Sequence, residues 1–320
     1  MRRSALLACS LLAATAVQAQ EASFSAEALE SVSYDGGALP DGQSALTFAV
    51  QVLLDRAGIS PGVIDGYKGG MSETAIRAFE AREGLEVDGL MDQAVWDALG
   101  GSGADAFVTS HTITEEEAQT VPELPEDYAE MAELQRLGYE RVSERIAEMF
   151  HMDEDALIAL NPGASFSAGE SVTVAQPQAA LQGEVTAIRI DGASGRLEAM
   201  DGSGNVVASY PVAVGSSETP SPQGSFEVVA IATEPTYSYR PDVNFQQGDN
   251  DEALTLPPGP NGPVGLVWID LNEPTYGIHG TPNPARLFVE QSHGCVRMSN
   301  WDAQELAGMV SAGVSVEITQ

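Results

Sequence analysis

The spacing of apolar residues changes near residue 184 from a helical period to a strand period, and a helical period returns only near the end of the chain, which limits the folds open to it. One segment places apolar side chains at i, i+3, i+4, i+7 and i+8, at Leu46, Ala49, Val50, Leu53 and Leu54. That spacing predicts an amphipathic helix. From Glu184 onward the apolar runs are short, rich in β-formers and separated by Gly, Asp, Ser and Asn. We therefore expect a multi-domain α+β protein, with a small three-helix domain at 45–100 and a β-rich domain at 184–320.

The expected helical domain contains the same type of turn twice. Ile64-Asp65-Gly66 follows the first helical segment, and Val87-Asp88-Gly89 follows the second. With Gln51 in the first helix and Phe79 in the second, residues 45–100 resemble the peptidoglycan-binding domain found beside many cell-wall enzymes. The resemblance implies contact with wall glycan or stem peptides. The sequence departs from the family at Glu80, where a glutamine is usual.

Two further segments separate this domain from the β-rich one. Residues 101–138 contain acidic runs and prolines, which predict a linker that is extended by charge repulsion. Residues 139–175 resemble a LysM module, a strand-helix-helix-strand unit that binds N-acetylglucosamine chains. Its most specific match is the run Leu160-Asn161-Pro162 before a β-prone segment at 172–174. The family's usual glycine-aspartate-threonine turn is replaced by Ser143-Glu144-Arg145.

The N-terminus reads as an export signal. Arg2 and Arg3 precede an apolar run that ends in Val17-Gln18-Ala19, a pattern that signal peptidase accepts. We expect a signal peptide at 1–19, a flexible lead at 20–44 and a location in the periplasm, associated with the cell wall. A lipid anchor on Cys9 is an alternative, although its apolar stretch is short. No other run approaches the roughly 20 apolar residues that span a bilayer, so no stable membrane insertion is expected.

The charge of the chain excludes one large class of partner. The sequence has 47 Asp and Glu against 14 Lys and Arg, a formal net charge of −33, and Lys68 is its only lysine. Such a polyanion repels the phosphates of nucleic acids and anionic lipids. We therefore expect no nucleic-acid partner.

A single thiol carries the chemistry expected of this chain. Once residues 1–19 are removed, Cys295 is the only cysteine, which excludes an internal disulfide. His279 lies 16 positions before it and His293 two before it, and imidazole is the side chain best suited to activate a thiol near neutral pH. Gly294 permits a tight turn, so the N–H groups of Gly294 and Cys295 are candidate donors to an oxyanion. Cysteine, histidine and backbone donors together indicate acyl transfer.

Two other interpretations of the same residues stay open. Cys295 can be an inert core thiol, because free cysteine is often buried. His279, His293 and Cys295 can also be gathered around a metal ion, although the His-x-Cys spacing is not a usual zinc motif.

Residues 184–320 resemble the L,D-transpeptidase catalytic domain, also called the YkuD-type domain. The match includes Tyr276-Gly277-Ile278-His279-Gly280-Thr281 and Ser292-His293-Gly294-Cys295-Val296-Arg297. The resemblance implies Cys295 as nucleophile, His279 as general base and the Gly280 carbonyl as the group that orients the imidazole. It also implies that Tyr276, Ser292 and His293 shape the substrate site and that Arg297 binds a substrate carboxylate. Acidic Glu290 stands in a segment where relatives often carry glycine and basic residues.

We therefore expect a peptidoglycan L,D-transpeptidase that needs no cofactor and no metal. Its thiol would form a thioester with the diaminopimelate of a tetrapeptide stem and release D-Ala. An amine on another stem would then give a 3-3 cross-link, a lysine of an envelope protein would give protein anchoring, and water would give an L,D-carboxypeptidase. The rivals are a cell-wall amidase or endopeptidase and a non-catalytic wall-binding protein.

Overall fold

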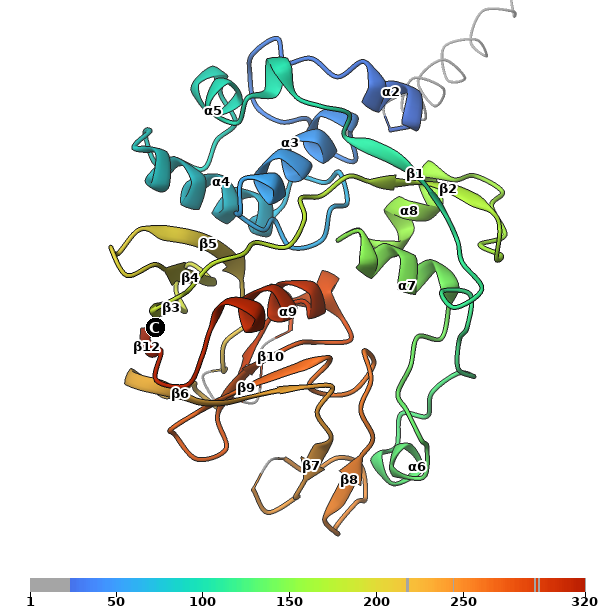
Figure 1. Cartoon of the computed structure of the whole chain (residues 1–320), viewed down its shortest axis with the longest axis vertical. Coiled ribbons are helices and arrows are strands. Elements are labelled where there is room, and N and C mark those ends of the chain that lie inside the picture. Colours follow the sequence, from blue (N-terminus) through green and yellow to red (C-terminus); the bar gives the residue numbers. More distant parts are fainter. Residues whose placement is uncertain (1–23, 217–218, 244, 291, 293, 320) are drawn as a thin grey trace, which may run out of the picture.

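The computed structural model describes residues 24–216, 219–243, 245–290, 292 and 294–319. The predicted signal peptide lies outside these residues. The chain forms a mixed helical and β structure in which a largely helical N-terminal half lies against a β-rich C-terminal half (Figure 1). None of the helices in the described residues is long and apolar enough to cross a bilayer.

The N-terminal half contains most of the helices. Its elements are α2 (Ala26–Glu30), α3 (Ala45–Arg56), α4 (Gly70–Glu83), α5 (Gln93–Ala98), the 3-10 helix η1 (Gly101–Gly103), β1 (Val108–Thr112), α6 (Tyr128–Ala132), α7 (Val142–Met149), α8 (Glu154–Leu160) and β2 (Ser171–Ala175). Side-chain caps set several of the helix starts. Ser44 accepts a hydrogen bond from Thr47 N at α3, and Asp92 accepts one from Val95 N at α5.

The C-terminal half contains one large sheet and one long helix. Its elements are β3 (Ala187–Asp191), β4 (Arg196–Met200), β5 (Val206–Pro211), β6 (Gly224–Thr233), β7 (Tyr237–Tyr239), β8 (Leu254–Leu256), β9 (Val267–Leu271), β10 (Gly277–His279), the 3-10 helix η2 (Pro284–Arg286), β11 (Val296–Arg297), α9 (Asn300–Met309) and β12 (Ser315–Thr319).

The eight-stranded sheet has the order β11-β10-β9-β6-β12-β3-β4-β5. The pairs β10–β11 and β12–β3 are parallel, and the other neighbouring pairs are antiparallel. The chain that leaves β5 returns to β11, because Ala213 and Arg297 exchange both backbone hydrogen bonds at 2.9 Å. The sheet is therefore curled so far that the chain after β5 pairs with β11. At this point, directly after Cys295, the two edges of the sheet are joined.

Two expectations from the sequence are wrong for the N-terminal half. The predicted flexible lead contains α2, and Phe24, Leu29, Tyr34 and Leu39 are buried in the core. The predicted extended linker contains β1, which pairs antiparallel with β2, and α6. Buried apolar side chains such as Phe107 and Ile113 hold this segment in place against the repulsion of its acids.

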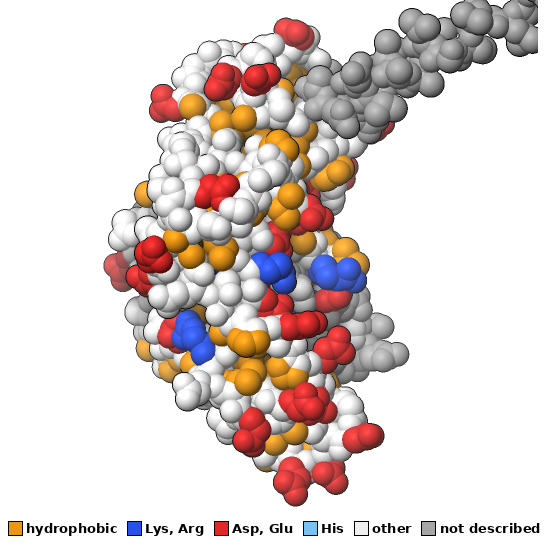
Figure 2. Space-filling view, turned by 90° about the vertical axis from the view of Figure 1, so that its right-hand side faces the viewer, with side chains coloured by type: hydrophobic (Ala, Val, Ile, Leu, Met, Phe, Trp, Pro, Cys, Tyr) orange, Lys and Arg blue, Asp and Glu red, His pale blue; other side chains and the backbone are white. Residues whose placement is uncertain are grey.

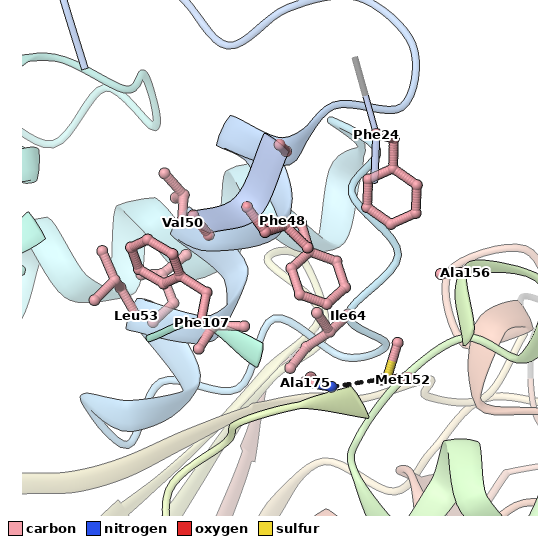
Figure 3. Packing of buried hydrophobic residues seen from close by; sticks show 14 of the residues in the cluster. Phe24, Phe48, Val50, Leu53, Ile64, Phe107, Met152, Ala156 and Ala175 are labelled. Atoms are coloured by element: carbon pink, nitrogen blue, oxygen red, sulfur yellow. Dashed lines mark hydrogen bonds between the residues drawn. The ribbon is translucent and has the colours of Figure 1, made fainter. Parts of the chain in front are cut away.

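The helical domain and the β1–α7–α8–β2 unit share one hydrophobic cluster. Phe48, Leu53 and Ile64 come from the first, and Met152, Ala156 and Ala175 from the second (Figure 3). The Met152 sulfur accepts a hydrogen bond from Ala175 N at 3.1 Å, drawn as a dashed line in Figure 3. The N-terminal half is consequently one packed body rather than two modules on a tether.

Acidic side chains are spread over the face shown in Figure 2, with few basic ones between them. They belong to the excess of 47 Asp and Glu over 14 Lys and Arg. The surface of the folded protein therefore carries part of this negative charge.

Candidate active site

The parallel pairing of β10 with β11 brings the two predicted catalytic side chains to one place. The register sets Ile278 opposite Val296 and His279 opposite Arg297. Cys295 directly precedes β11, so it lies beside the start of β10, two residues from His279. This one strand pairing therefore brings Cys295 and His279 close in space, although they are 16 positions apart in sequence.

The loop before Cys295 is fixed by hydroxyl groups. Ser292 Oγ donates to the Cys295 carbonyl and accepts a hydrogen bond from Gly294 N at 3.1 Å. Ser221 Oγ donates to the Gly294 carbonyl at 2.7 Å and accepts from Gly215 N at 2.8 Å. These contacts hold the backbone on both sides of the thiol.

Position 294 requires glycine for two reasons. Its φ is +120°, which L side chains rarely adopt, and a Cβ there would lie 2.9 Å from Cε1 of Tyr276. The Gly294 N–H, expected as an oxyanion donor, instead donates to Ser292 Oγ. His293 lies outside the described residues.

The imidazole of His279 is buried and oriented by two neighbours. Its ring is stacked on Trp268 with centroids 5.5 Å apart, and its Nδ1 lies 2.7 Å from the Gly280 carbonyl oxygen. A carbonyl only accepts, so Nδ1 carries the proton in the neutral ring and Nε2 is left as the basic nitrogen. Burial above all, with a smaller contribution from the charge of Arg297, lowers the pKa of His279 to about 4, although the hydrogen bond to the Gly280 carbonyl acts in the opposite direction.

The thiol of Cys295 is half-buried and has backbone partners. Its Sγ lies 3.6 Å from the Thr275 carbonyl oxygen, which accepts the S–H. Burial raises the pKa of Cys295, while the Gly277 N–H acts in the opposite direction. Thr275 itself has a φ of 71°, a strained conformation for a β-branched residue. No pattern in the sequence indicates that strain.

Cys295 and His279 line one cavity of about 300 Å³. Three other predicted site residues, Tyr276, Ser292 and Arg297, line it too. Within the described residues Arg297 Nε is buried and has no hydrogen-bond partner, although Arg297 Nη2 donates to the Glu290 carbonyl. The cavity is therefore lined by a thiol, an imidazole and a guanidinium group.

Several lining residues were missed by sequence reasoning. Tyr237 and Phe245 come from the β7–β8 hairpin, Trp268 from β9 and Tyr128 from α6. The pair Trp268-Ile269 has a strand signal, but nothing in its spacing to His279 indicates stacking. In the described part of the chain, no group of three or more His, Cys, Asp or Glu is arranged to hold a metal ion.

The repeated Asp-Gly turns of the helical domain are held in the same way. Gln51 Oε1 accepts from Asp65 N at 3.1 Å and from Gly66 N at 2.8 Å. In the second repeat Glu80 Oε2 accepts from Asp88 N at 3.0 Å and from Gly89 N at 2.9 Å. Both side chains are buried, so each fastens a turn to its own helix.

A half-buried thiol and a buried imidazole thus line one cavity at one end of a curled sheet, an arrangement that suits acyl transfer. Residues 186–318 match the model of the L,D-transpeptidase catalytic domain, and residues 43–99 match that of the "Putative peptidoglycan binding domain". The "Putative L,D-transpeptidase YkuD" of Bacillus licheniformis is 34% identical over 182 residues, which are 55% of this chain and 92% of the relative. Its namesake from Bacillus subtilis is 32% identical, over 55% of this chain and 92% of the relative.

The chain belongs to the L,D-transpeptidase family. Solved structures give a more distant likeness. An L,D-transpeptidase from Xylanimonas cellulosilytica is 16% identical with a TM-score of 0.40, covering 90% of this chain and 100% of that one. An L,D-transpeptidase from Mycobacterium smegmatis is 19% identical with a TM-score of 0.35, covering 48% and 64%. The family assignment rests on the sequence matches.

Proposed function

We propose that this protein is a peptidoglycan L,D-transpeptidase in which Cys295 is the nucleophile and His279 the general base. The observation that carries the proposal is the β10–β11 pairing, which sets both side chains in one cavity with Nε2 of His279 as the basic nitrogen. Family membership supports a transferase acting on peptidoglycan, and the geometry supports the choice of residues.

The first half-reaction acylates the thiol. Nε2 of His279 takes the proton from the Cys295 thiol as sulfur attacks the carbonyl of the diaminopimelate that precedes D-Ala. The C–N bond to D-Ala breaks, and His279 returns the proton to the departing amine, which leaves a thioester on Cys295. Because Gly294 N is engaged by Ser292, the N–H of Cys295 is the backbone donor that we assign to the oxyanion.

The second half-reaction transfers the acyl group. An acceptor amine attacks the thioester, His279 takes a proton from that amine, and the sulfur leaves and recovers a proton. A diaminopimelate amine gives a 3-3 cross-link, a protein lysine gives protein anchoring and water gives a tripeptide. Arg297, whose buried Nε has no partner in the described part of the chain, is the residue that we assign to a substrate carboxylate.

The N-terminal half would hold this catalyst on the wall. The match of residues 43–99 supports a peptidoglycan-binding role. The pairing of β1 with β2 around α7 and α8 supports a LysM-like unit, although its first strand, β1, lies before the predicted bounds 139–175 and α6 is inserted between β1 and α7. A surface that stays bound to a polymer raises the local concentration of stems at the cavity. We propose an exported protein that works in the periplasm, at the wall.

The test uses tetrapeptide-containing muropeptides incubated with the mature chain and with Cys295→Ala, followed by mass spectrometry. Loss of D-Ala together with 3-3 dimers, absent with Cys295→Ala of unchanged melting temperature, is the expected result. Loss of D-Ala without dimers would assign the protein as an L,D-carboxypeptidase. Unchanged stems, with the protein pelleting on purified sacculi, would replace the enzyme by a wall-binding protein.

A further inference from the structure

One residue that lines the cavity around Cys295 comes from the N-terminal half of the chain. Residues 124–138, which we call the strap, lie between β1 and α7 in sequence and contain α6. Figure 1 shows α6 beside the β7–β8 hairpin and away from the other helices of its half. Tyr128, the first residue of α6, lines the cavity together with Cys295 and His279.

Backbone and amide hydrogen bonds fasten the strap to the catalytic half. Gln247 Oε1 accepts from Tyr128 N at 3.2 Å, and Gln247 Nε2 donates to the Glu126 carbonyl at 2.9 Å. At the other end, Leu137 N donates to the Pro258 carbonyl at 3.0 Å, and the Leu137 carbonyl accepts from Asn261 N at 3.1 Å. The strap is thus joined to the hairpin side of the cavity at both of its ends.

The backbones come together so closely at one point that only glycine fits. A Cβ on Gly259 would lie 2.0 Å from the Leu137 carbonyl oxygen. Arg136 adds a bidentate ion pair to Glu234 at 2.6 and 3.1 Å. Leu137, Tyr239 and Leu256 form a fully buried apolar cluster between the strap and the hairpin. Close backbone packing and full burial indicate a permanent contact of this half with the hairpin.

Tyr128 stands in a group of aromatic rings on the wall of the cavity. Its ring meets Tyr239 edge-on at 5.3 Å, and Tyr237 and Phe245 each at 6.1 Å. Tyr237 and Phe245 also line the cavity. Edge-to-face rings keep a fixed orientation, so the wall is a rigid apolar surface opposite the reacting groups.

The occupant of this space follows from the position of the thiol. Because Cys295 lines the cavity, the groups that flank the attacked carbonyl must enter it, and these belong to the donor stem. A space of about 300 Å³ admits only the portion next to that carbonyl. The methylene groups of a diaminopimelate side chain and the adjoining peptide planes are the parts of a donor that an aromatic wall stabilises.

We propose that Tyr128 is a substrate-positioning residue supplied by the N-terminal half, which packs against the donor stem peptide beside Cys295. This inference rests on the proposed function for the identity of the donor. The substrate cavity of the catalytic domain is then incomplete without the strap, because Tyr128, one of its lining residues, belongs to another part of the sequence.

The test compares the full mature chain with Tyr128→Ala, Tyr128→Phe and Leu134→Ala. Leu134 lies on the same strap but is 38% exposed and does not line the cavity, so it is the matched control. With a soluble tetrapeptide donor, Tyr128→Ala is expected to raise KM about tenfold with a much smaller change in kcat, since an apolar contact to the bound stem is lost. The KM of Tyr128→Phe and of Leu134→Ala should stay within about twofold of the wild-type value, because both variants keep an aromatic ring at position 128.

A second readout does not depend on turnover. Alkylation of Cys295 is measured with iodoacetamide and with a bulky fluorescent maleimide, and the ratio of the two rates reports access to the cavity. Tyr128→Ala should raise the relative rate of the bulky reagent, whereas Leu134→Ala should not. If Tyr128→Ala lowers the melting temperature, Tyr128→Leu is measured in its place and is expected to move KM and the ratio in the same direction.

The outcomes separate the two proposals. An unchanged KM and an unchanged alkylation ratio in the Tyr128 variants would overturn the role of Tyr128. A wild type that leaves tetrapeptide stems intact would overturn the proposed function and with it the donor assignment. In that case the alkylation ratio would still show whether Tyr128 restricts the access of bulky reagents to Cys295.

Discussion

The protonation states of the proposed nucleophile and base follow from how deeply the two groups are buried. His279 is 5% exposed, and burial holds its pKa at about 4, so the imidazole is neutral at pH 7. Burial also raises the pKa of Cys295, so the thiol is protonated there. We therefore expect a neutral thiol–imidazole pair that separates charge only when a substrate is bound, in contrast to a preformed thiolate–imidazolium pair.

This state predicts a specific pH dependence for thiol reactivity. In the chain without residues 1–19 Cys295 is the only thiol, so iodoacetamide reports on it alone. The alkylation rate should rise about tenfold per pH unit between about pH 6 and 8, because only the thiolate reacts and its fraction grows in that proportion. Stopped-flow or mass-spectrometric rates across this range provide the measurement. A rate that is already constant from pH 5 to 7 would indicate an ion pair and contradict the neutral site.

At the scale of residues, the sequence pointed to a thiol and an imidazole that line one cavity, but not to their surroundings. Cys295 and His279 were chosen as candidates because they are rare residue types inside recognisable local motifs. The strain at Thr275 and the stacking of Trp268 on His279 depend on backbone angles and strand register, to which spacing along the chain gives no access. The engagement of Gly294 N by Ser292 was missed for the same reason.

At the scale of elements, the two Asp-Gly turns of the helical domain differ in one buried group. Gln51 fastens the first turn as a neutral amide, whereas Glu80 fastens the second as an acid. Burial raises the pKa of Glu80, so the folded state holds its proton more tightly than the unfolded chain does. The stability from this group is therefore present at low pH and is lost as pH rises through the folded pKa.

Substitution of Glu80 tests this difference. Glu80→Gln keeps an acceptor for the two N–H groups and removes the buried charge, so it should stabilise the protein at pH 7, and by more at pH 7 than at pH 4. Glu80→Ala should destabilise it by about 1–3 kcal/mol, because it leaves buried N–H groups unpaired. Urea denaturation at both pH values provides the measurement. The reciprocal variant Gln51→Glu should lower stability at pH 7, and a gain there would contradict the argument.

The sequence predicted the helices better than the connections between them. Residues 45–100 have strong helical spacing and capping residues, and α3, α4 and α5 lie there. Strand β1 was missed because Val108-Thr109-Ser110-His111-Thr112 is largely polar and pairs only with β2, through its backbone. The strap was included in the predicted linker because of the acidic runs and prolines of residues 101–138, whereas its own apolar side chains, Leu137 above all, determine its position.

At the scale of the whole molecule, buried polar groups join the two halves. Glu148 of α7 accepts hydrogen bonds from Tyr139 Oη at 3.1 Å and from Asn300 Nδ2 at the start of α9, at 3.1 Å. Asp302 of α9 accepts one from Ser60 Oγ at 3.0 Å. His151 is stacked on Trp301 and paired through Nδ1 with Asp55 at 2.8 Å. No pattern in the sequence indicated these contacts, because the partners of all of them except Tyr139 and Glu148 are more than 90 positions apart.

These groups make the stability of the molecule depend on pH in one direction. Burial raises the pKa of Glu148 and of Asp302 to about 7, above their unfolded values, so the stability that they confer is lost as pH rises through about 7. The pKa of His151 is also raised, although burial alone would lower it, because the carboxylates of Asp55, Asp302 and Glu305 outweigh burial. Its contribution is present below pH 6.5 and is lost as pH rises through the folded pKa. Their combined effect is a less stable molecule at pH 8 than at pH 5.

The variant Glu148→Gln should remove part of that loss. Glutamine still accepts from Asn300 but does not ionise, so up to about 3 kcal/mol of the fall in unfolding free energy between pH 5 and pH 8 should disappear. Calorimetric melting at the two pH values measures the fall. The control Glu317→Gln removes an exposed carboxylate on β12 and should keep the wild-type difference. If Glu148→Gln and Glu317→Gln both lose as much stability as the wild type between pH 5 and pH 8, Glu148 is ionised throughout this range. The two halves would then be held together in spite of a buried negative charge at their contact.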